Sequence, residues 1–108
     1  MQSQYNMTTD FTAQCYVLIK QIPEGRVTSY KEIAKALNSR AYRAVGSAMA
    51  KNKDLITIPC HRVVKSDGKV GGYALGTETK IALLEKEGVK IKDKEVQDFD
   101  TLLFRFET

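Results

Sequence analysis

Apolar residues near the start of the chain recur at the spacing of an amphipathic helix, at Phe11, Cys15, Leu18, Ile19 and Ile22. Asp10 is a candidate N-cap for this helix, and the tripeptide Pro23-Glu24-Gly25 predicts its end. Because Cys15 lies on the apolar stripe, we expect it to be a core thiol. The mostly polar residues 1–8 precede the helix and are expected to be flexible.

Two further helices are predicted between residues 29 and 51. Ser29 and Glu32 have the spacing of a capping box, and the helix that they begin ends near Asn38. Its inward residues are Ile33, Ala34 and Leu37. Ser39 is a candidate cap for the second helix, which runs to about Lys51. The predicted buried face of this helix consists of Ala41, Val45, Ala48 and Met49.

The opposite face of the second helix is polar and basic, with Arg40, Arg43, Ser47 and Lys51 close together around the axis. Gly46 lowers the helix propensity and is expected where another helix approaches closely. Two short helices with a cationic second helix are typical of a helix-turn-helix that binds DNA. An ordinary helical hairpin with a solvated face has the same pattern, so the pattern alone leaves both interpretations open.

Extended segments and turns replace the helical pattern after residue 53. Residues 55–58 read as extended until Pro59 interrupts them, and Asp67-Gly68 is a hairpin-turn signal between two valines. Three glycines around Tyr73 predict a loop whose backbone can approach a ligand closely. These glycines are Gly71, Gly72 and Gly76.

A last helix and a small sheet are predicted near the end of the sequence. Thr77 is a candidate cap for a helix with Ile81 and Leu84 inward, and Gly88 fits the position that ends it. Apolar and polar residues alternate over 89–91 and 102–106, and we expect the two segments to pair. The predicted fold is a single α/β domain over residues 1–108, mostly α: a winged-helix-like helix-turn-helix with a small hairpin or short sheet.

Composition and charge narrow the function classes. A chain of 108 residues suits one domain. Residues 1–76 carry 11 Lys and Arg against 5 Asp and Glu, net +6, whereas residues 77–108 are net −2, and a basic section suits a polyanionic partner. Two Cys and one His leave a Cys/His zinc site short of ligands, so no metal is expected. Without a signal peptide or an apolar run near the ~20 residues that cross a bilayer, we expect a soluble, intracellular protein that does not bind a membrane.

The dipeptide Cys60-His61 carries the candidate chemistry. A thiol reacts as its thiolate, and a nearby His or Arg lowers the thiol pKa. Neighbouring residues on extended backbone point apart, so a bridging water or a local bend is needed for the imidazole to take the thiol proton. A carboxylate would orient the imidazole, and the candidates are Asp54, Asp67, Glu85 and Glu87. The alternative is a buried cysteine beside a surface histidine.

The wider string distinguishes these alternatives. The segments Arg43-Ala44-Val45-Gly46-Ser47-Ala48-Met49, Asn52, Ile58-Pro59-Cys60-His61-Arg62-Val63-Val64 and Gly72-Tyr73-Ala74-Leu75-Gly76 occur in this order. Together they make the chain resemble the O6-alkylguanine-DNA alkyltransferases over residues 9–91. The resemblance implies a minimal alkyltransferase domain, of the type that follows an extra N-terminal domain in many members.

The resemblance also implies a set of catalytic residues. Cys60 matches the alkyl acceptor, His61 the base that acts through a water, and Glu87 the acid that orients the histidine. Tyr30 matches the tyrosine that crowds the 3′ phosphate and donates to the guanine. Asn52 matches the asparagine that braces the turn between the recognition helix and the active-site strand. The implied reaction needs no cofactor.

Substrate and DNA contacts are implied in the same way. The guanine pocket would be formed by Met49, the Val63 carbonyl, the Tyr73 ring and the Ala74 amide. Arg43 matches the arginine that fills the place of the flipped base while the helix lies in the minor groove. Further DNA contacts are expected from Arg40, Tyr42, Ser47 and Lys51. The implied partner of the monomeric protein is duplex DNA containing O6-alkylguanine, met in the cytoplasm of a prokaryote or the nucleus of a eukaryote.

Two departures keep other functions open. The chain is about as long as the alkyltransferase-like proteins, which bind alkylated DNA without repairing it and usually have Trp where Cys60 stands. Leu75 stands where relatives often have Gly or an aromatic residue, which affects the expected preference for alkyl size. Ala74 replaces a frequent Ser, but its implied role uses the backbone amide and is expected to be retained. The third interpretation is a small helix-turn-helix regulator in which Cys60 is structural.

Overall fold

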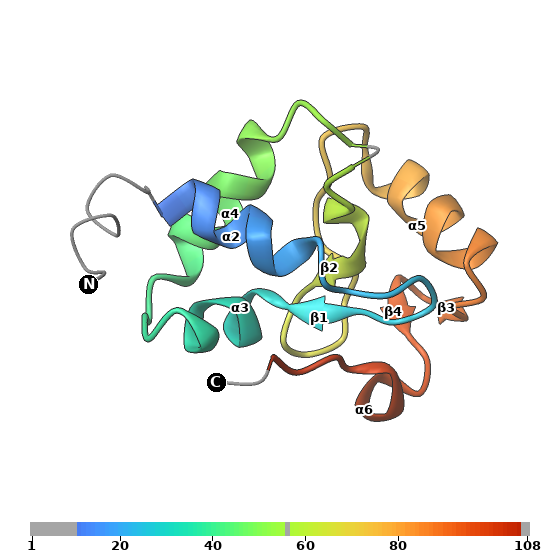
Figure 1. Ribbon diagram of the computed structural model, residues 1–108. Coiled ribbons are helices and arrows are strands. Elements are labelled where there is room, and N and C mark those ends of the chain that lie inside the picture. The colour runs from blue at the N-terminus through green and yellow to red at the C-terminus, as the bar shows by residue number, and fades with distance from the viewer. Residues whose placement is uncertain (1–10, 56, 107–108) are drawn as a thin grey trace.

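Helices make up most of the regular structure in the computed structural model, which describes residues 11–55 and 57–106 (Figure 1). In chain order the elements are α2 (Phe11–Ile19), β1 (Thr28–Ser29), α3 (Tyr30–Ala36), α4 (Tyr42–Lys51), the 3-10 helix η1 (Cys60–Arg62), β2 (Val63–Val64), α5 (Thr77–Lys86), β3 (Ile91–Lys92), β4 (Glu95–Val96) and α6 (Phe99–Leu102). The expected α/β fold, mostly α with short sheets, is confirmed. None of the described helices is long and apolar enough to cross a membrane.

The main core lies where α2, α3 and α4 meet. Its fully buried members include Cys15, Ile19, Ile33, Val45 and Ala48. The Tyr16 hydroxyl donates to the Ala48 carbonyl at 2.7 Å and joins α2 to α4. The prediction that Cys15 is a core thiol is therefore confirmed.

The start of α4 differs from the expectation. Ser39 does not cap the helix: its hydroxyl accepts a hydrogen bond from the Ala41 amide at 2.9 Å, and α4 begins one residue later. Ala41 is therefore exposed rather than part of the buried face. The hydroxyl of Ser39 closes a local turn with the backbone two residues on, and this turn competes with capping. The Ser29 cap of α3 is confirmed, since its Oγ accepts from the Glu32 amide at 3.1 Å.

The short strands pair differently from the predicted sheet. β1 runs parallel to β2, with Thr28 opposite Val63. The C-terminal segment lies on the other side of β1, where Val27 bridges Leu103 and the Thr28 hydroxyl donates to the Phe104 carbonyl at 2.7 Å (Figure 1). The expected pairing of residues 89–91 with 102–106 is therefore wrong.

Residues 89–91 instead lead into a local hairpin. β3 pairs antiparallel with β4, and the two residues between them, Asp93 and Lys94, have φ of 54° and 63°. Positive φ at both central residues is the geometry of the tightest hairpin turn. The sequence carries no glycine or asparagine at these positions, so the turn gave no signal.

A glycine lies just beyond each end of helix α5: Gly76 before it and Gly88 after its C-cap residue. Gly76, not Thr77, is its N-cap residue, and the Thr77 hydroxyl donates weakly to the Gly71 carbonyl at 3.4 Å. At the other end Gly88 has a φ of 96° and donates to the Glu85 carbonyl. The next amide, that of Val89, donates to the Leu84 carbonyl, which completes a Schellman motif. The predicted end of the helix is confirmed, and the proposed cap Asp10 of the first helix lies outside the described residues.

Replacing Gly88 by alanine should destabilise the protein by about 1–2 kcal/mol, because a Cβ is unfavourable in the left-handed conformation. The matched control is Gly72→Ala, where a Cβ meets no atom within 4 Å and the backbone φ is not in that region. Urea denaturation should separate the two variants, with the control within about 0.5 kcal/mol of wild type. Equal stabilities for the two variants would contradict the role of Gly88.

Candidate active site

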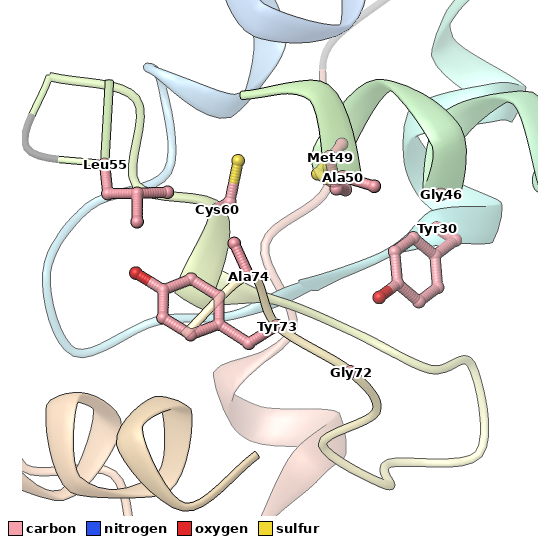
Figure 2. Close-up of a pocket in the computed structure, with 9 residues that line it drawn as sticks. All are labelled: Tyr30, Gly46, Met49, Ala50, Leu55, Cys60, Gly72, Tyr73 and Ala74. Carbon is pink, nitrogen blue, oxygen red and sulfur yellow. The ribbon is translucent and has the colours of Figure 1, made fainter. Parts of the chain in front are cut away.

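A cavity of about 270 Å³ opens beside Cys60. In Figure 2 the Cys60 side chain lies between Leu55 on one side and Met49 and Ala50 of α4 on the other, with Tyr73 and Ala74 below it. The lining residues come from four parts of the chain: Tyr30, Gly46, Met49, Ala50, Leu55, Cys60, Gly72, Tyr73 and Ala74. The structure thus brings Cys60 together with Tyr30, Met49, Tyr73 and Ala74 at one site.

Asn52 holds the turn that presents the thiol. It follows α4 as the C-cap residue, and its Nδ2 donates both to the Ile58 carbonyl at 3.1 Å and to the Cys60 sulfur at 2.9 Å. Its Oδ1 accepts from the Asp54 amide at 2.8 Å. Asn52 is buried, and its hydrogen bonds to Ile58 and Cys60 form away from solvent and connect the end of α4 to the cysteine.

The backbone before and at the cysteine is turned rather than extended. The Asp54 carboxylate accepts from the Thr57 amide at 3.0 Å, and its carbonyl accepts from the Ile58 amide. The expectation of an extended segment over residues 55–58 is therefore wrong for the described residues, Ile56 lying outside them. Local hydrogen bonds from an aspartate compete with strand formation. Cys60 and His61 lie in η1, so the extended geometry assumed for them is also corrected to a tight bend.

The environment of the Cys60 thiol has opposing effects on its pKa. Burial is the largest effect and raises the pKa above its ordinary value. The hydrogen bond from Asn52 and the positive charge of Lys80 lower it in part. Burial raises the pKa of both Tyr30 and Tyr73, and the negative charge of an ionised Cys60 raises both further. The two phenols thus lie within electrostatic reach of the sulfur.

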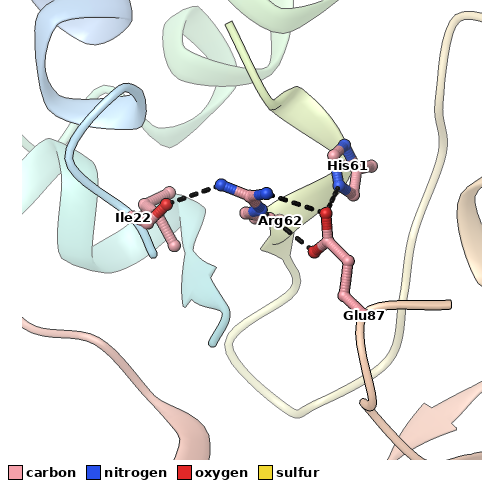
Figure 3. Close-up of polar contacts among 4 residues, drawn as sticks. All are labelled: Ile22, His61, Arg62 and Glu87. Atoms are coloured by element: carbon pink, nitrogen blue, oxygen red, sulfur yellow. Dashed lines mark hydrogen bonds and ion pairs between the residues drawn. The ribbon is translucent and has the colours of Figure 1, made fainter. Parts of the chain in front are cut away.

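His61 is held by a carboxylate from the end of α5. Its Nε2 is 2.9 Å from Glu87 Oε2, while its Nδ1 is buried without a hydrogen-bond partner among the described residues (Figure 3). Neither ring nitrogen therefore bonds directly to Cys60. Of the four candidate carboxylates, Glu87 is the one that contacts the imidazole. Its carboxyl is brought there by the Schellman end of α5, which places Glu87 at the C-cap.

Arg62 holds the same carboxylate from the other side. Its Nε and Nη2 donate to the two Glu87 oxygens at 3.0 and 2.7 Å, and its Nη1 donates to the Ile22 carbonyl at 2.8 Å (Figure 3). Burial raises the pKa of Glu87, but the hydrogen bonds and charges of Arg62 and His61 outweigh burial and leave it below the usual value. The sequence analysis did not single out Arg62, although its place in the Pro-Cys-His-Arg segment was a signal.

Val63 and Gly46 differ from their expected places. Val63 is fully buried and is not among the described residues that line the cavity, and its carbonyl accepts from Lys80 Nζ at 2.6 Å. No neighbouring helix packs closely against Gly46 among the described residues, because a Cβ there would meet no atom within 4 Å. It lines the cavity instead. Lys80 was missed by the sequence analysis, since nothing in the local pattern distinguishes it from the exposed lysines.

The basic face of α4 borders this cavity. Three polar residues are exposed on α4: Arg43, Ser47 and Lys51. Ser47 and Lys51 directly follow the cavity residues Gly46 and Ala50 in sequence, and Arg43 lies one helical turn before Gly46. Arg40 and the 45% exposed Tyr42 line a second hollow at the α3–α4 junction, together with Lys31, Lys35, Asn38 and Ser39. Among the described residues no group of three or more His, Cys, Asp and Glu side chains is placed to hold a metal ion. The arrangement combines a thiol that lines a cavity of about 270 Å³ with an exposed cationic surface.

Comparisons with known proteins agree on one family. Residues 10–89 match the family model described as 6-O-methylguanine DNA methyltransferase, DNA binding domain. A methylated-DNA–protein-cysteine methyltransferase of Saccharolobus islandicus is 46% identical over 86 residues, which cover 80% of this chain and 56% of that protein. A bifunctional methyltransferase/endonuclease of Picrophilus torridus is 41% identical over 98 residues, or 90% of this chain and 32% of that protein. The chain therefore spans a third to just over half of these relatives.

Solved structures give the same result. S. pombe Atl1 in complex with damaged DNA containing O6-carboxymethylguanine matches with a TM-score of 0.77 and 28% identity, over 88% of this chain and 94% of that one. Mycobacterium tuberculosis OGT in complex with DNA matches with a TM-score of 0.70 and 44% identity, over 73% of this chain and 50% of that one. Both the backbone and the sequence thus resemble these proteins.

The contribution of Glu87 to stability should depend on pH. Because the fold lowers the Glu87 pKa, the ionised carboxylate stabilises the fold above the unfolded pKa of about 4.5, and this contribution is lost as the pH falls through the lower folded value. The difference in unfolding free energy between wild type and Glu87→Gln should therefore be largest near pH 7 and should narrow below pH 4.5. Urea denaturation across pH 3–7 measures it.

The control is Glu85→Gln, an exposed carboxylate two residues away on α5. This variant should follow the wild-type stability across the whole pH range. A difference between wild type and Glu87→Gln that stays constant with pH would contradict the ion-pair network.

Proposed function

The chain belongs to the 6-O-methylguanine DNA methyltransferase family, and from this premise we propose that it repairs DNA by transferring the alkyl group of O6-alkylguanine to Cys60. The observation that carries the proposal is the Cys60 sulfur facing a cavity, next to an imidazole held by Glu87. Structural and buried cysteines do not need a cavity of this size. The acceptor is a protein residue, so each molecule acts once.

The proposed transfer is a displacement at a saturated carbon. The thiol proton passes through a water to His61 Nδ1, and Glu87 stabilises the imidazolium that forms. The sulfur attacks the alkyl carbon, the S–C bond forms, the C–O6 bond breaks, and the electron pair goes to the guanine oxygen. Hydrogen bonds to the leaving guanine stabilise its developing charge, and the Tyr30 hydroxyl and the Ala74 amide are the candidate hydrogen-bond donors. The guanine takes up one proton from the Tyr30 hydroxyl, and the proton held by His61 returns through water to Tyr30, so both side chains end neutral. The products are neutral guanine and a thioether, and no cofactor is needed.

The proposed DNA contacts lie on the exposed face of α4. An alkylated base inside the stack must be extruded before the sulfur reaches it, which costs a few kcal/mol. Arg43, exposed near the cavity residue Gly46, is the proposed side chain that occupies the vacated place. Arg40, Tyr42, Ser47 and Lys51 would contact the backbone of duplex DNA from the minor groove. In this proposal the protein acts as a monomer. Because its substrate is DNA, it would act in the cytoplasm of a prokaryote or the nucleus of a eukaryote.

A second candidate function is binding of alkylated DNA without repair. The observation that favours it is the backbone match to S. pombe Atl1 in complex with damaged DNA, with a TM-score of 0.77 compared with 0.70 for the M. tuberculosis OGT. The presence of Cys60 at the cavity supports transfer instead. The two functions differ in the fate of the lesion, which stays intact in the second.

Incubation with duplex DNA carrying labelled O6-methylguanine should move the label to the peptide that contains Cys60, with a yield that approaches one methyl per protein. Peptide mass analysis measures the transfer. The control Cys60→Ser should remove it, whereas Cys15→Ser should leave the Cys60 peptide labelled. Tight binding with an unlabelled Cys60 would favour the second function.

Arg43→Ala should slow the repair of duplex DNA by about ten- to a hundredfold, because extrusion loses its support. Reaction with free O6-benzylguanine should stay within about twofold of wild type, since a free base needs no extrusion. Single-turnover rates with both substrates measure the difference, and Arg105→Ala, another exposed arginine, is the control. An equal loss on both substrates would reject the extrusion role.

A further inference from the structure

Lys80 is the largest fully buried side chain among the described residues, with 1% of its surface exposed. Its ammonium donates to the Val63 carbonyl at 2.6 Å and to the Gly72 carbonyl at 3.0 Å. Lysine is almost never fully buried unless its charge is paired. Within the described residues no carboxylate forms an ion pair with Lys80, and its ammonium is instead hydrogen-bonded to the two carbonyls.

The two carbonyls belong to two segments that each contribute lining residues to the cavity, although Val63 itself does not line it. Val63 follows η1 and is three residues from Cys60. Gly72 lies in the glycine-rich loop and directly precedes Tyr73 and Ala74, and all three residues line the cavity. A loop with this many glycines has high conformational freedom when nothing holds it. The Lys80 ammonium therefore connects the segment that presents the sulfur to the loop segment that also lines the cavity.

The charge of Lys80 also acts on the sulfur. Burial lowers the Lys80 pKa from its ordinary value to about 8, against the effect of the Cys60 thiolate, so the amine is still mostly protonated at pH 7. The other ionisable groups around the thiol are Cys15 on α2, Tyr30 on α3, His61 on η1 and Tyr73 in the loop. Among the residues that the structure describes, the positive charge of Lys80 lowers the thiol pKa, against the larger effect of burial.

We propose that Lys80 is a positioning residue of the transfer site: its buried ammonium fixes the distance between the Cys60 turn and the Tyr73 loop and holds a positive charge near the sulfur. This inference deepens the proposed function and rests on it. Two consequences follow for the site. The cavity keeps its width in the absence of substrate, and the ionised sulfur is stabilised before a base arrives.

The first experiment measures the charge without any guanine. Alkylation of Cys60 by iodoacetamide is followed against pH by peptide mass analysis in wild type, Lys80→Met and Lys80→Gln. Both variants should react about three- to tenfold more slowly at pH 7, with the rate profile displaced to higher pH, because both lose the positive charge. The control Lys86→Met, an exposed lysine on the same helix, should match wild type.

The second experiment measures the connection between the two segments. Reaction rates are measured against the concentration of O6-benzylguanine at pH 7, where Lys80 is mostly protonated. The concentration that gives half-maximal rate is compared, because a changed fraction of thiolate alters the maximal rate rather than this concentration. Lys80→Met should need about tenfold more O6-benzylguanine for half-maximal rate. Lys80→Gln should recover part of this loss, because its amide still donates a hydrogen bond to a carbonyl.

Several results would overturn the proposal. One is a Cys60 alkylation profile in Lys80→Met that coincides with wild type, even if this variant is less stable. Another applies to wild type and needs no variant to fold: ammonium protons of Lys80 that exchange with water as fast as those of Lys86 by NMR. If wild type fails to take alkyl groups from guanine but the iodoacetamide profile of Lys80→Met is displaced from that of wild type, the proposed function fails and the charge effect of Lys80 stands.

Discussion

The side-chain amide of Asn52 joins the end of α4 to the turn that presents the thiol, and the rest of the site depends on this connection. One nitrogen donates both to the Ile58 carbonyl and to the Cys60 sulfur, and the oxygen accepts from the Asp54 amide. Because the two bonds from the nitrogen are buried, they fix the sulfur relative to α4. The surface proposed to meet DNA and the proposed nucleophile are thereby held at a constant spacing.

The site balances burial against charge. Burial keeps water away from the sulfur but disfavours the thiolate, and this effect is the largest on the Cys60 pKa. Lys80 and Asn52 offset part of it. A separate set of charges, Arg62 with Glu87, is arranged around His61 and does not touch the sulfur. The electrostatics of the site thus fall into two sets of groups: Lys80 and Asn52 favour the thiolate, and Glu87 with Arg62 holds the His61 imidazole.

Several structural features that depend on interactions within a few residues were predicted correctly from the sequence. The Ser29 cap, the end of α5 at Gly88 and the burial of Cys15 depend on local hydrogen bonds and periodicity, and all three are confirmed. The carboxylate that orients His61 was reached through family resemblance rather than local chemistry. Some local features were not predicted either, because Ser39 closes a turn instead of capping α4 and the Asp93-Lys94 turn carries no glycine or asparagine. Other missed features depend on contacts between distant segments. The burial of Lys80 is decided by two carbonyls eight and seventeen residues away, which no local pattern encodes.

The contact between β1 and the C-terminal segment has a consequence for the order in which the fold assembles. Thr28 and Phe104 are 76 positions apart, so their hydrogen bond closes one of the longest loops in the protein. Contacts of such separation form late, because loop closure carries an entropy cost that nearer contacts avoid. On a ribosome, the strand that leads into α3 and Tyr30 therefore lacks one of its two neighbours until residue 104 has left the exit tunnel.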